Sequence, residues 1–210
     1  MASSPSIKTI IFDLGGVIVP FDFSRAYARL ETLSGLTRDE IRHKLTGDGF
    51  SASFERGDVT PPEFLAEFNR RLSTRLAMDE FTEIWVSIFS LQTLVSEALI
   101  ASLASRYRVI LLSNTNQTHF EWIARTYPHL GHMHHHVLSY QVRAMKPDPA
   151  IYAAAISHAQ CRANECFFTD DVLPYVEGAR AAGIDAVQFT GEAALRGHLA
   201  ERGIIAPSGA

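Results

Sequence analysis

Short runs of apolar, β-favouring residues alternate along most of the chain with longer segments in which apolar residues recur at helical spacing. The first run, at 9–12, leads into Asp13 and then into two glycines that let the backbone turn sharply. Further strands are expected at 108–112, 137–140, 166–168 and 186–189, with helices at 94–105, 122–127, 148–159 and 174–182 and a last helix after them. This alternation predicts an α/β fold, a doubly wound, mostly parallel sheet covered by helices.

One long segment interrupts the alternation, because its pattern is helical throughout. Thr37 with Glu40, and Thr60 with Glu63, have the spacing of capping boxes, which begin helices. Apolar spacing predicts helices at 24–33, 50–56, 61–72 and 79–89. We therefore expect a core made of residues 1–19 and 92–210, with a small helical insertion at 20–91.

Polar side chains end or closely follow several predicted strands. They are Asp13, Ser113 with Asn114, Lys146, and Asp170 with Asp171. In a parallel sheet the carboxyl ends of the strands lie along one edge, so residues far apart in sequence can meet there.

Together these groups suit phosphoryl transfer through a covalent intermediate at a magnesium ion. Mg²⁺ prefers oxygen ligands such as carboxylates, and a lysine adds fixed positive charge for the moving phosphoryl group. Each residue also has a plainer interpretation. Asp170 and Asp171 could form an ordinary turn, Lys146 could be a solvated loop residue, and Ser113 could cap the next helix.

Composition narrows the class of protein. The 210 residues carry a net charge of −4 and are 47% hydrophobic, which is typical of a globular protein and offers no basic face to nucleic acid. Cys161 and Cys166 are too few for a disulfide framework, and we expect free thiols. The first residues lack a signal-peptide pattern and no apolar run is long enough to span a membrane, so we expect a cytoplasmic protein, as a monomer or homodimer.

Four motifs in register resemble the haloacid dehalogenase-like hydrolase superfamily, with a helical cap inserted after the first motif. They are Ile-Phe-Asp-Leu-Gly-Gly-Val at 11–17, Leu-Ser-Asn-Thr at 112–115, Met-Lys-Pro-Asp at 145–148 and Phe-Thr-Asp-Asp at 168–171. Within the superfamily the chain most resembles bacterial sugar-phosphate phosphatases of the α-D-glucose-1-phosphate phosphatase kind.

The resemblance implies a role for each motif residue. Asp13 would attack phosphorus and become an aspartyl phosphate, and Lys146 would bridge nucleophile and phosphate. Ser113 and Asn114 would hold phosphate oxygens. Mg²⁺ would be held by Asp13, the backbone carbonyl of Gly15, Asp170 and Asp171. The implied substrate is a small phosphorylated metabolite, with a sugar phosphate as the first expectation.

Two residues depart from the family pattern. Many related phosphatases carry a second aspartate two residues after the nucleophile, as acid and base for the leaving group and the water, but here that position is Gly15. Asp22, His43 or Glu55 could replace it, and we expect the cap near 50–55 to lie closest to the phosphate. Tyr175 stands where relatives often carry Asn.

These departures leave two alternatives open: a binding or regulatory protein with negligible turnover, and a 2-haloacid dehalogenase, which would need no magnesium. The four histidines at 132 and 134–136 lack a metal-ligand pattern, and we expect them in a solvated connection. Trp85 and Trp122 fall on apolar helical stripes, which predicts packing roles.

Overall fold

The computed structural model describes residues 6–206, which leaves residues 1–5, most of the segment on which the signal-peptide prediction rests, outside the described part. Five parallel strands form one sheet in the order β3-β2-β1-β4-β5. The strands are β1 (Thr9–Phe12), β2 (Arg108–Ser113), β3 (His135–Leu138), β4 (Cys166–Asp170) and β5 (Asp185–Gln188). The predicted α/β fold with a parallel sheet is therefore confirmed.

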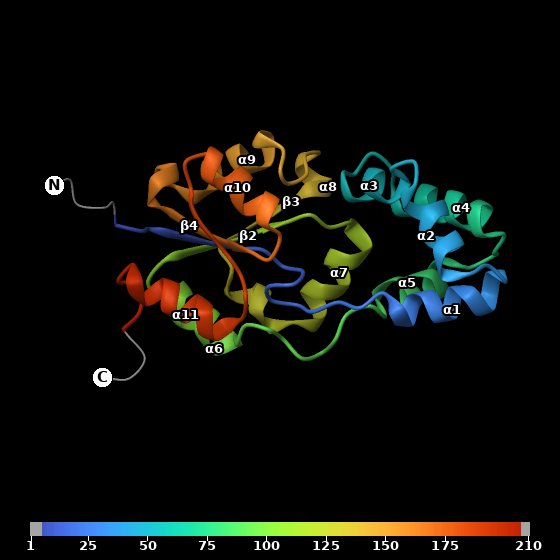
Figure 1. Ribbon diagram of the computed structural model, residues 1–210, viewed down its shortest axis with the longest axis horizontal. Coiled ribbons are helices and arrows are strands. Elements are labelled where there is room, and N and C mark those ends of the chain that lie inside the picture. Colours follow the sequence, from blue (N-terminus) through green and yellow to red (C-terminus); the bar gives the residue numbers. More distant parts are fainter. Residues whose placement is uncertain (1–5, 207–210) are drawn as a thin grey trace.

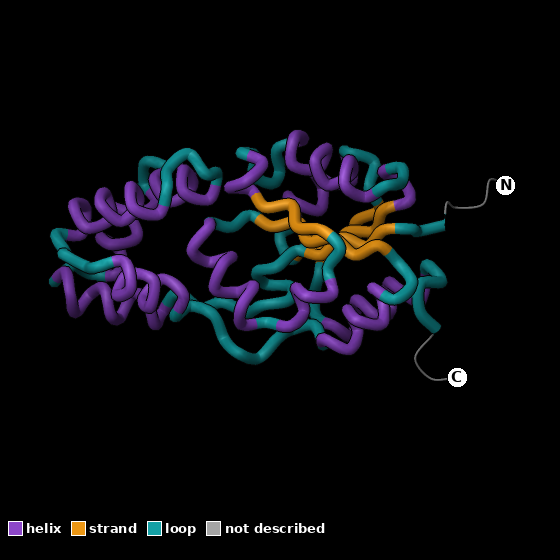
Figure 2. Tube along the Cα trace, turned by 180° about the vertical axis from the view of Figure 1, so that it is seen from behind, coloured by secondary structure: helices purple, strands orange, loops and turns teal. Residues whose placement is uncertain are grey.

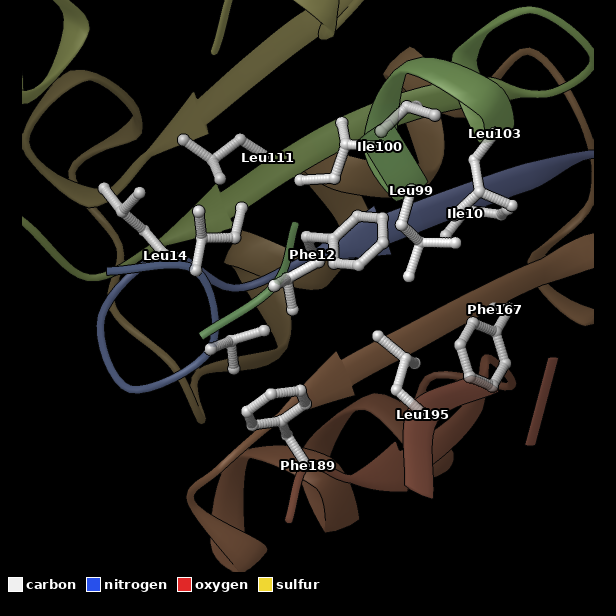
Figure 3. Close-up of a cluster of buried hydrophobic side chains, with 14 of the residues drawn as sticks. Ile10, Phe12, Leu14, Leu99, Ile100, Leu103, Leu111, Phe167, Phe189 and Leu195 are labelled. Atoms are coloured by element: carbon white, nitrogen blue, oxygen red, sulfur yellow. The ribbon is translucent and has the colours of Figure 1, made fainter. Parts of the chain in front are cut away.

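Helices cover both faces of the sheet (Figures 1 and 2). They are α6 (Glu97–Ala104), α7 (Gln117–Thr126), α8 (Ser139–Val142), α9 (Pro149–Ala159), α10 (Leu173–Ala181) and α11 (Glu192–Glu201), with 3₁₀ turns at Pro128–His132 and Ala163–Glu165. Successive side chains of a strand point to opposite faces. Ile10 and Phe12 therefore pack against α6 and α11 (Figure 3), whereas Ile11 packs against α9 and α10.

The remaining helices form a separate layer beyond the carboxyl ends of the strands (Figure 1). They are α1 (Ser24–Ser34), α2 (Arg38–Thr46), α3 (Phe50–Glu55), α4 (Pro61–Leu72) and α5 (Met78–Val86). They have their own hydrophobic cluster, in which the Phe64 ring lies 4.3 Å from that of Phe50 and 4.1 Å from that of Phe54, between centroids. Both predicted capping boxes are present at α2 and α4. We call these helices the cap; its predicted limits, 20–91, stay a prediction.

Two antiparallel segments connect the core to the cap. The Asp22 N–H donates to the Ile88 carbonyl at 2.7 Å, and Phe21 pairs with Phe89 in an isolated β-bridge. Because the two segments hydrogen-bond to each other, they enter and leave the cap together. Among residues 6–206, no helix has both the length and the apolar character needed to cross a membrane.

The strand predicted at 137–140 was wrong in its position. β3 covers His135–Leu138, and Ser139 begins α8. The Ser139 hydroxyl accepts the Thr115 N–H and lies within hydrogen-bond distance of the Thr115 and Glu55 carbonyls, and these contacts turn the chain away from the sheet. The predicted solvated histidine connection was also partly wrong, because His135 and His136 belong to β3 and His134 Nδ1 accepts the Val109 N–H at 3.0 Å.

Candidate active site

A buried ion cluster lies at the carboxyl edge of the sheet. The Lys146 Nζ atom donates to Asp13 Oδ1 at 2.7 Å and to Asp170 Oδ2 at 2.5 Å. Asp13 follows β1 directly, and Asp170 is the last residue of the neighbouring strand β4. Lys146 lies in the segment before α9, and its Nζ also donates to the Leu112 carbonyl of β2. The structure therefore brings together three of the residues that the sequence placed at strand ends.

Asn114 fixes the backbone from which Lys146 extends. The Asn114 side-chain oxygen accepts the Lys146 N–H at 2.8 Å, and its amide nitrogen donates to the Lys146 carbonyl at 3.1 Å. Both polar atoms of this side chain are therefore used to position the lysine. The phosphate contact from Asn114 that the resemblance implies stays a prediction.

Burial sets the protonation of the cluster. Burial raises the pKa of Asp13 to about 7, and the Lys146 ammonium opposes this rise. Burial by itself would lower the pKa of Lys146, but the charges of Asp13 and Asp170 outweigh it, so this pKa is raised and the ammonium is retained. Taking such charges out of water costs several kcal/mol per ion, roughly, unless partners surround them.

Asp171 adds a third carboxylate and an excess of negative charge. One oxygen from each of Asp13, Asp170 and Asp171 lies within 4.8 Å of the others. Burial, followed by the charge of Asp170, raises the pKa of Asp171. A Cβ atom at Gly16 would overlap the Asp171 carboxylate, so only glycine lets the chain pass this close. Three carboxylates around one ammonium form an oxygen donor set that fits a hard divalent cation such as Mg²⁺.

Ser113 ends β2 beside this cluster and is buried. Its hydroxyl makes one long contact, 3.4 Å to the Asn114 carbonyl, and the following helix α7 is capped by Asn116 instead. The interpretation of Ser113 as a helix cap is therefore wrong. The Thr115 N–H donates to the Ser139 hydroxyl, so this amide is not free for a phosphate oxygen.

Two hollows of about 110 Å³ and 210 Å³ open over the cluster and share the residues Gly15, Phe21, Glu55 and Asn114. The larger is also lined by Asp13, Lys146, Asp171, Val172 and Tyr175. The smaller extends between core and cap along Leu14, Phe23, Ile88, Phe89, Ser113, Thr115, His119 and Ile123. Glu55 lines both hollows, and that the cap near 50–55 lies closest to the phosphate stays a prediction.

The three replacement acids suggested by the sequence occupy different places. Glu55, at the end of α3, lines both hollows, and burial raises its pKa. Asp22 is exposed and accepts hydrogen bonds from Ser24, whose groups lower the pKa of Asp22. His43 lies on α2 beside a separate surface hollow of the cap.

Phe21 and His119 are site residues that the sequence did not reveal. Phe21 lies in the first connecting segment and lines both hollows, and no motif marks it. His119, on α7, stacks on Trp85 of the cap at 5.3 Å, and burial lowers the pKa of His119 to about 4. Trp85 and Trp122 both pack against other aromatic rings, as their spacing predicted.

Comparison with known proteins agrees with this fold. D-ribitol-5-phosphate phosphatase from Bacteroides thetaiotaomicron is 28% identical over 188 residues, which cover 87% of this chain and 91% of that protein. Phosphatase MT3486 from Mycobacterium tuberculosis is 29% identical over 189 residues, covering 86% of each. The haloacid dehalogenase family enzyme BT-2542 from B. thetaiotaomicron, in complex with magnesium and inorganic phosphate, superposes with a TM-score of 0.77 at 27% identity, covering 87% of this chain and 94% of that one.

The family assignment rests on most of the chain. The sequence model of the haloacid dehalogenase-like hydrolases matches residues 7–183, which include all four motifs. The particular resemblance to glucose-1-phosphate phosphatases stays a prediction. The chain belongs to the haloacid dehalogenase-like hydrolase family.

Proposed function

We propose that this chain is a Mg²⁺-dependent phosphatase that hydrolyses a small phosphorylated metabolite through an aspartyl phosphate on Asp13. The observation that carries the proposal is the buried cluster in which Lys146 bridges Asp13 and Asp170, with Asp171 within 4.8 Å of both carboxylates. The phosphatase names of two relatives and the magnesium and phosphate bound by a structural neighbour support it.

Each residue of the cluster has a task in this reaction. Asp13 attacks phosphorus, and Lys146 holds one Asp13 oxygen so that the carboxylate keeps its orientation. The Lys146 ammonium also balances charge on the phosphoryl group as it moves. Ser113 and the Asn114 N–H would bind phosphate oxygens. Mg²⁺, held by Asp13, Asp170, Asp171 and the Gly15 carbonyl, would offset the repulsion between the carboxylates and the phosphate.

The name of one relative and the volumes of the two hollows both bear on the class of substrate. One relative is named for a sugar-alcohol phosphate, and the hollows of about 110 Å³ and 210 Å³ over the cluster suit a small substrate. We therefore propose sugar and sugar-alcohol phosphates as the first class to test.

The decisive experiment is release of inorganic phosphate from a panel of such phosphates, with Mg²⁺ and with a chelator. We expect turnover that depends on Mg²⁺ and that falls by roughly 10⁴-fold or more in Asp13→Asn, because the nucleophile is lost. Asp39→Asn, which removes an exposed carboxylate on α2, is the matched control and should leave turnover unchanged.

Two results would overturn the proposal. Turnover of a 2-haloacid that survives chelation would favour the dehalogenase alternative. The absence of phosphate release from every compound of the panel would favour the binding or regulatory alternative, which the missing aspartate at Gly15 motivates.

A further inference from the structure

The space beside Gly15 is filled by an aromatic ring. A Cβ atom built on Gly15 would lie 3.1 Å from Cε1 of Phe21. Phe21 is held there by its backbone bridge to Phe89 and by edge-to-face packing on Phe23, at 5.7 Å between centroids. An acidic side chain two residues after Asp13 would therefore meet the Phe21 ring, and the proton relay must come from elsewhere.

The side chains around the hollows leave few candidates for that relay. Asp13, Asp171 and Lys146 belong to the ion cluster. His119 has both ring nitrogens engaged, one with the Asn116 side chain and one with the Trp85 carbonyl. Among the other described residues that line the hollows, the ionisable groups are the Tyr175 phenol and the Glu55 carboxyl, and only the latter comes from the cap.

Glu55 is held against the core by its own backbone. Its carbonyl accepts the Ser139 hydroxyl at 2.5 Å, across 84 positions of sequence. Two residues later, a Cβ at Gly57 would overlap the Tyr140 carbonyl, so the end of α3 lies directly on α8. Burial is the cause that raises the pKa of Glu55, and this favours a carboxyl that carries a proton. The cap therefore presents an acid to the hollow above Asp13.

We propose that the Glu55 carboxyl is the proton donor to the leaving group. This inference rests on the proposed phosphatase function. As the bond from Asp13 to phosphorus forms and the bond to the leaving oxygen breaks, that oxygen takes the Glu55 proton. A water then attacks the aspartyl phosphate and gives a proton to the Glu55 carboxylate, which restores Asp13 and releases inorganic phosphate.

The test compares leaving groups in Glu55→Gln, which removes the acid and preserves the shape. The leaving group of a sugar or sugar-alcohol phosphate is a strongly basic alkoxide, which needs a proton. The leaving group of p-nitrophenyl phosphate is a stable phenolate, which does not. Since kcat/KM reports the first, phosphoryl-transferring step, we expect it to fall by ~10²–10⁴-fold for the sugar phosphate and by less than about tenfold for p-nitrophenyl phosphate. Asp58→Asn, an exposed acid in the same part of the cap, is the control and should change neither value.

The outcomes separate this inference from the proposed function. Retained Mg²⁺-dependent turnover of p-nitrophenyl phosphate shows that the variant is folded and that Asp13 still acts. Equal losses for both substrates, or no loss for either, would overturn the role of Glu55 and leave the phosphatase function standing. A wild-type protein that releases phosphate from neither substrate would instead contradict the phosphatase function itself.

Discussion

The core and the cap face the same hollows with opposite kinds of surface. The core contributes charged groups that are buried and held by several partners, as Lys146 is between Asp13 and Asp170. The cap is built on stacked aromatic rings. Among the described residues, its helices bring Glu55 to the hollows, and the segments that connect them to the core bring the apolar Phe21, Phe23, Ile88 and Phe89. In the proposed reaction the core would supply the nucleophile and the charged groups around it, whereas the cap would exclude water, shape the space for the leaving group and supply Glu55.

The largest effect is expected from Lys146→Met in the core. Removal of the ammonium leaves Asp13 and Asp170 facing each other without a cation, and breaking a buried pair in this way costs about 3–5 kcal/mol of unfolding free energy. Urea unfolding in a chelator measures this loss, and Mg²⁺ should recover part of it. Lys8→Met is the matched control, because Lys8 pairs with Glu165 at the surface, where such pairs contribute about 1 kcal/mol or less. Equal losses in the two variants would contradict the description of the core as a buried charged cluster.

A similar loss is expected in the cap from Phe64→Ala, but confined to one region. Phe64 packs between Phe50 and Phe54, and removal of such a buried ring costs about 3–5 kcal/mol. Hydrogen exchange should show lost protection across α1 to α5 while the strands stay protected, which would also test the predicted cap at 20–91. Phe167→Ala, in β4, is the counterpart and should lower protection in the core. Loss of protection throughout both regions in Phe64→Ala would show that core and cap unfold as one unit.

The same contrast explains what the sequence predicted and what it did not. The sequence could predict that Asp13, Lys146 and Asp170 meet. Asp13 and Asp170 lie at the ends of buried apolar strands, Lys146 lies in the segment that follows another strand, and parallel strands end at one edge of the sheet. How the cap docks on the core decides that Phe21 lies beside Gly15. It also decides that Glu55, rather than Asp22 or His43, lies above the cluster. That docking is fixed by contacts between distant segments, which leave no local pattern.

The position of β3, inside the core, was also missed because it depends on contacts between distant segments. Its apolar pattern predicted a strand at 137–140, yet the strand is His135–Leu138, because Ser139 leaves the sheet to bind Thr115 and Glu55. A polar residue that satisfies two distant backbone groups overrides the local preference of the residues around it. The residues that join the core to the cap are therefore the ones that sequence patterns describe least well.

His119 joins the two regions, and its titration gives the smallest predicted effect. A carbonyl can only accept, so Nε2 carries the hydrogen that binds the Trp85 carbonyl at 3.0 Å, and Nδ1 accepts from the Asn116 amide at 3.1 Å. Burial lowers the pKa of His119 from 6.5 to about 4 in the folded protein. Between these values the unfolded chain binds a proton that the folded protein does not, so the unfolding free energy falls as the pH falls, by up to about 1.4 kcal/mol per pH unit.

The measurement is urea unfolding of the wild type and of His119→Gln at several pH values from 7.5 to 4.5, roughly spanning the unfolded and folded titrations. The variant should be less stable at neutral pH, because the contact between core and cap is weakened, but its stability should depend less steeply on pH below about 6.5. His43→Gln, an exposed histidine on α2, should follow the wild-type curve. Parallel curves for the wild type and His119→Gln would mean that this histidine does not stay neutral between the two regions. Convergence of the two curves on acidification would instead show that part of the stability of the contact between core and cap depends on an uncharged ring.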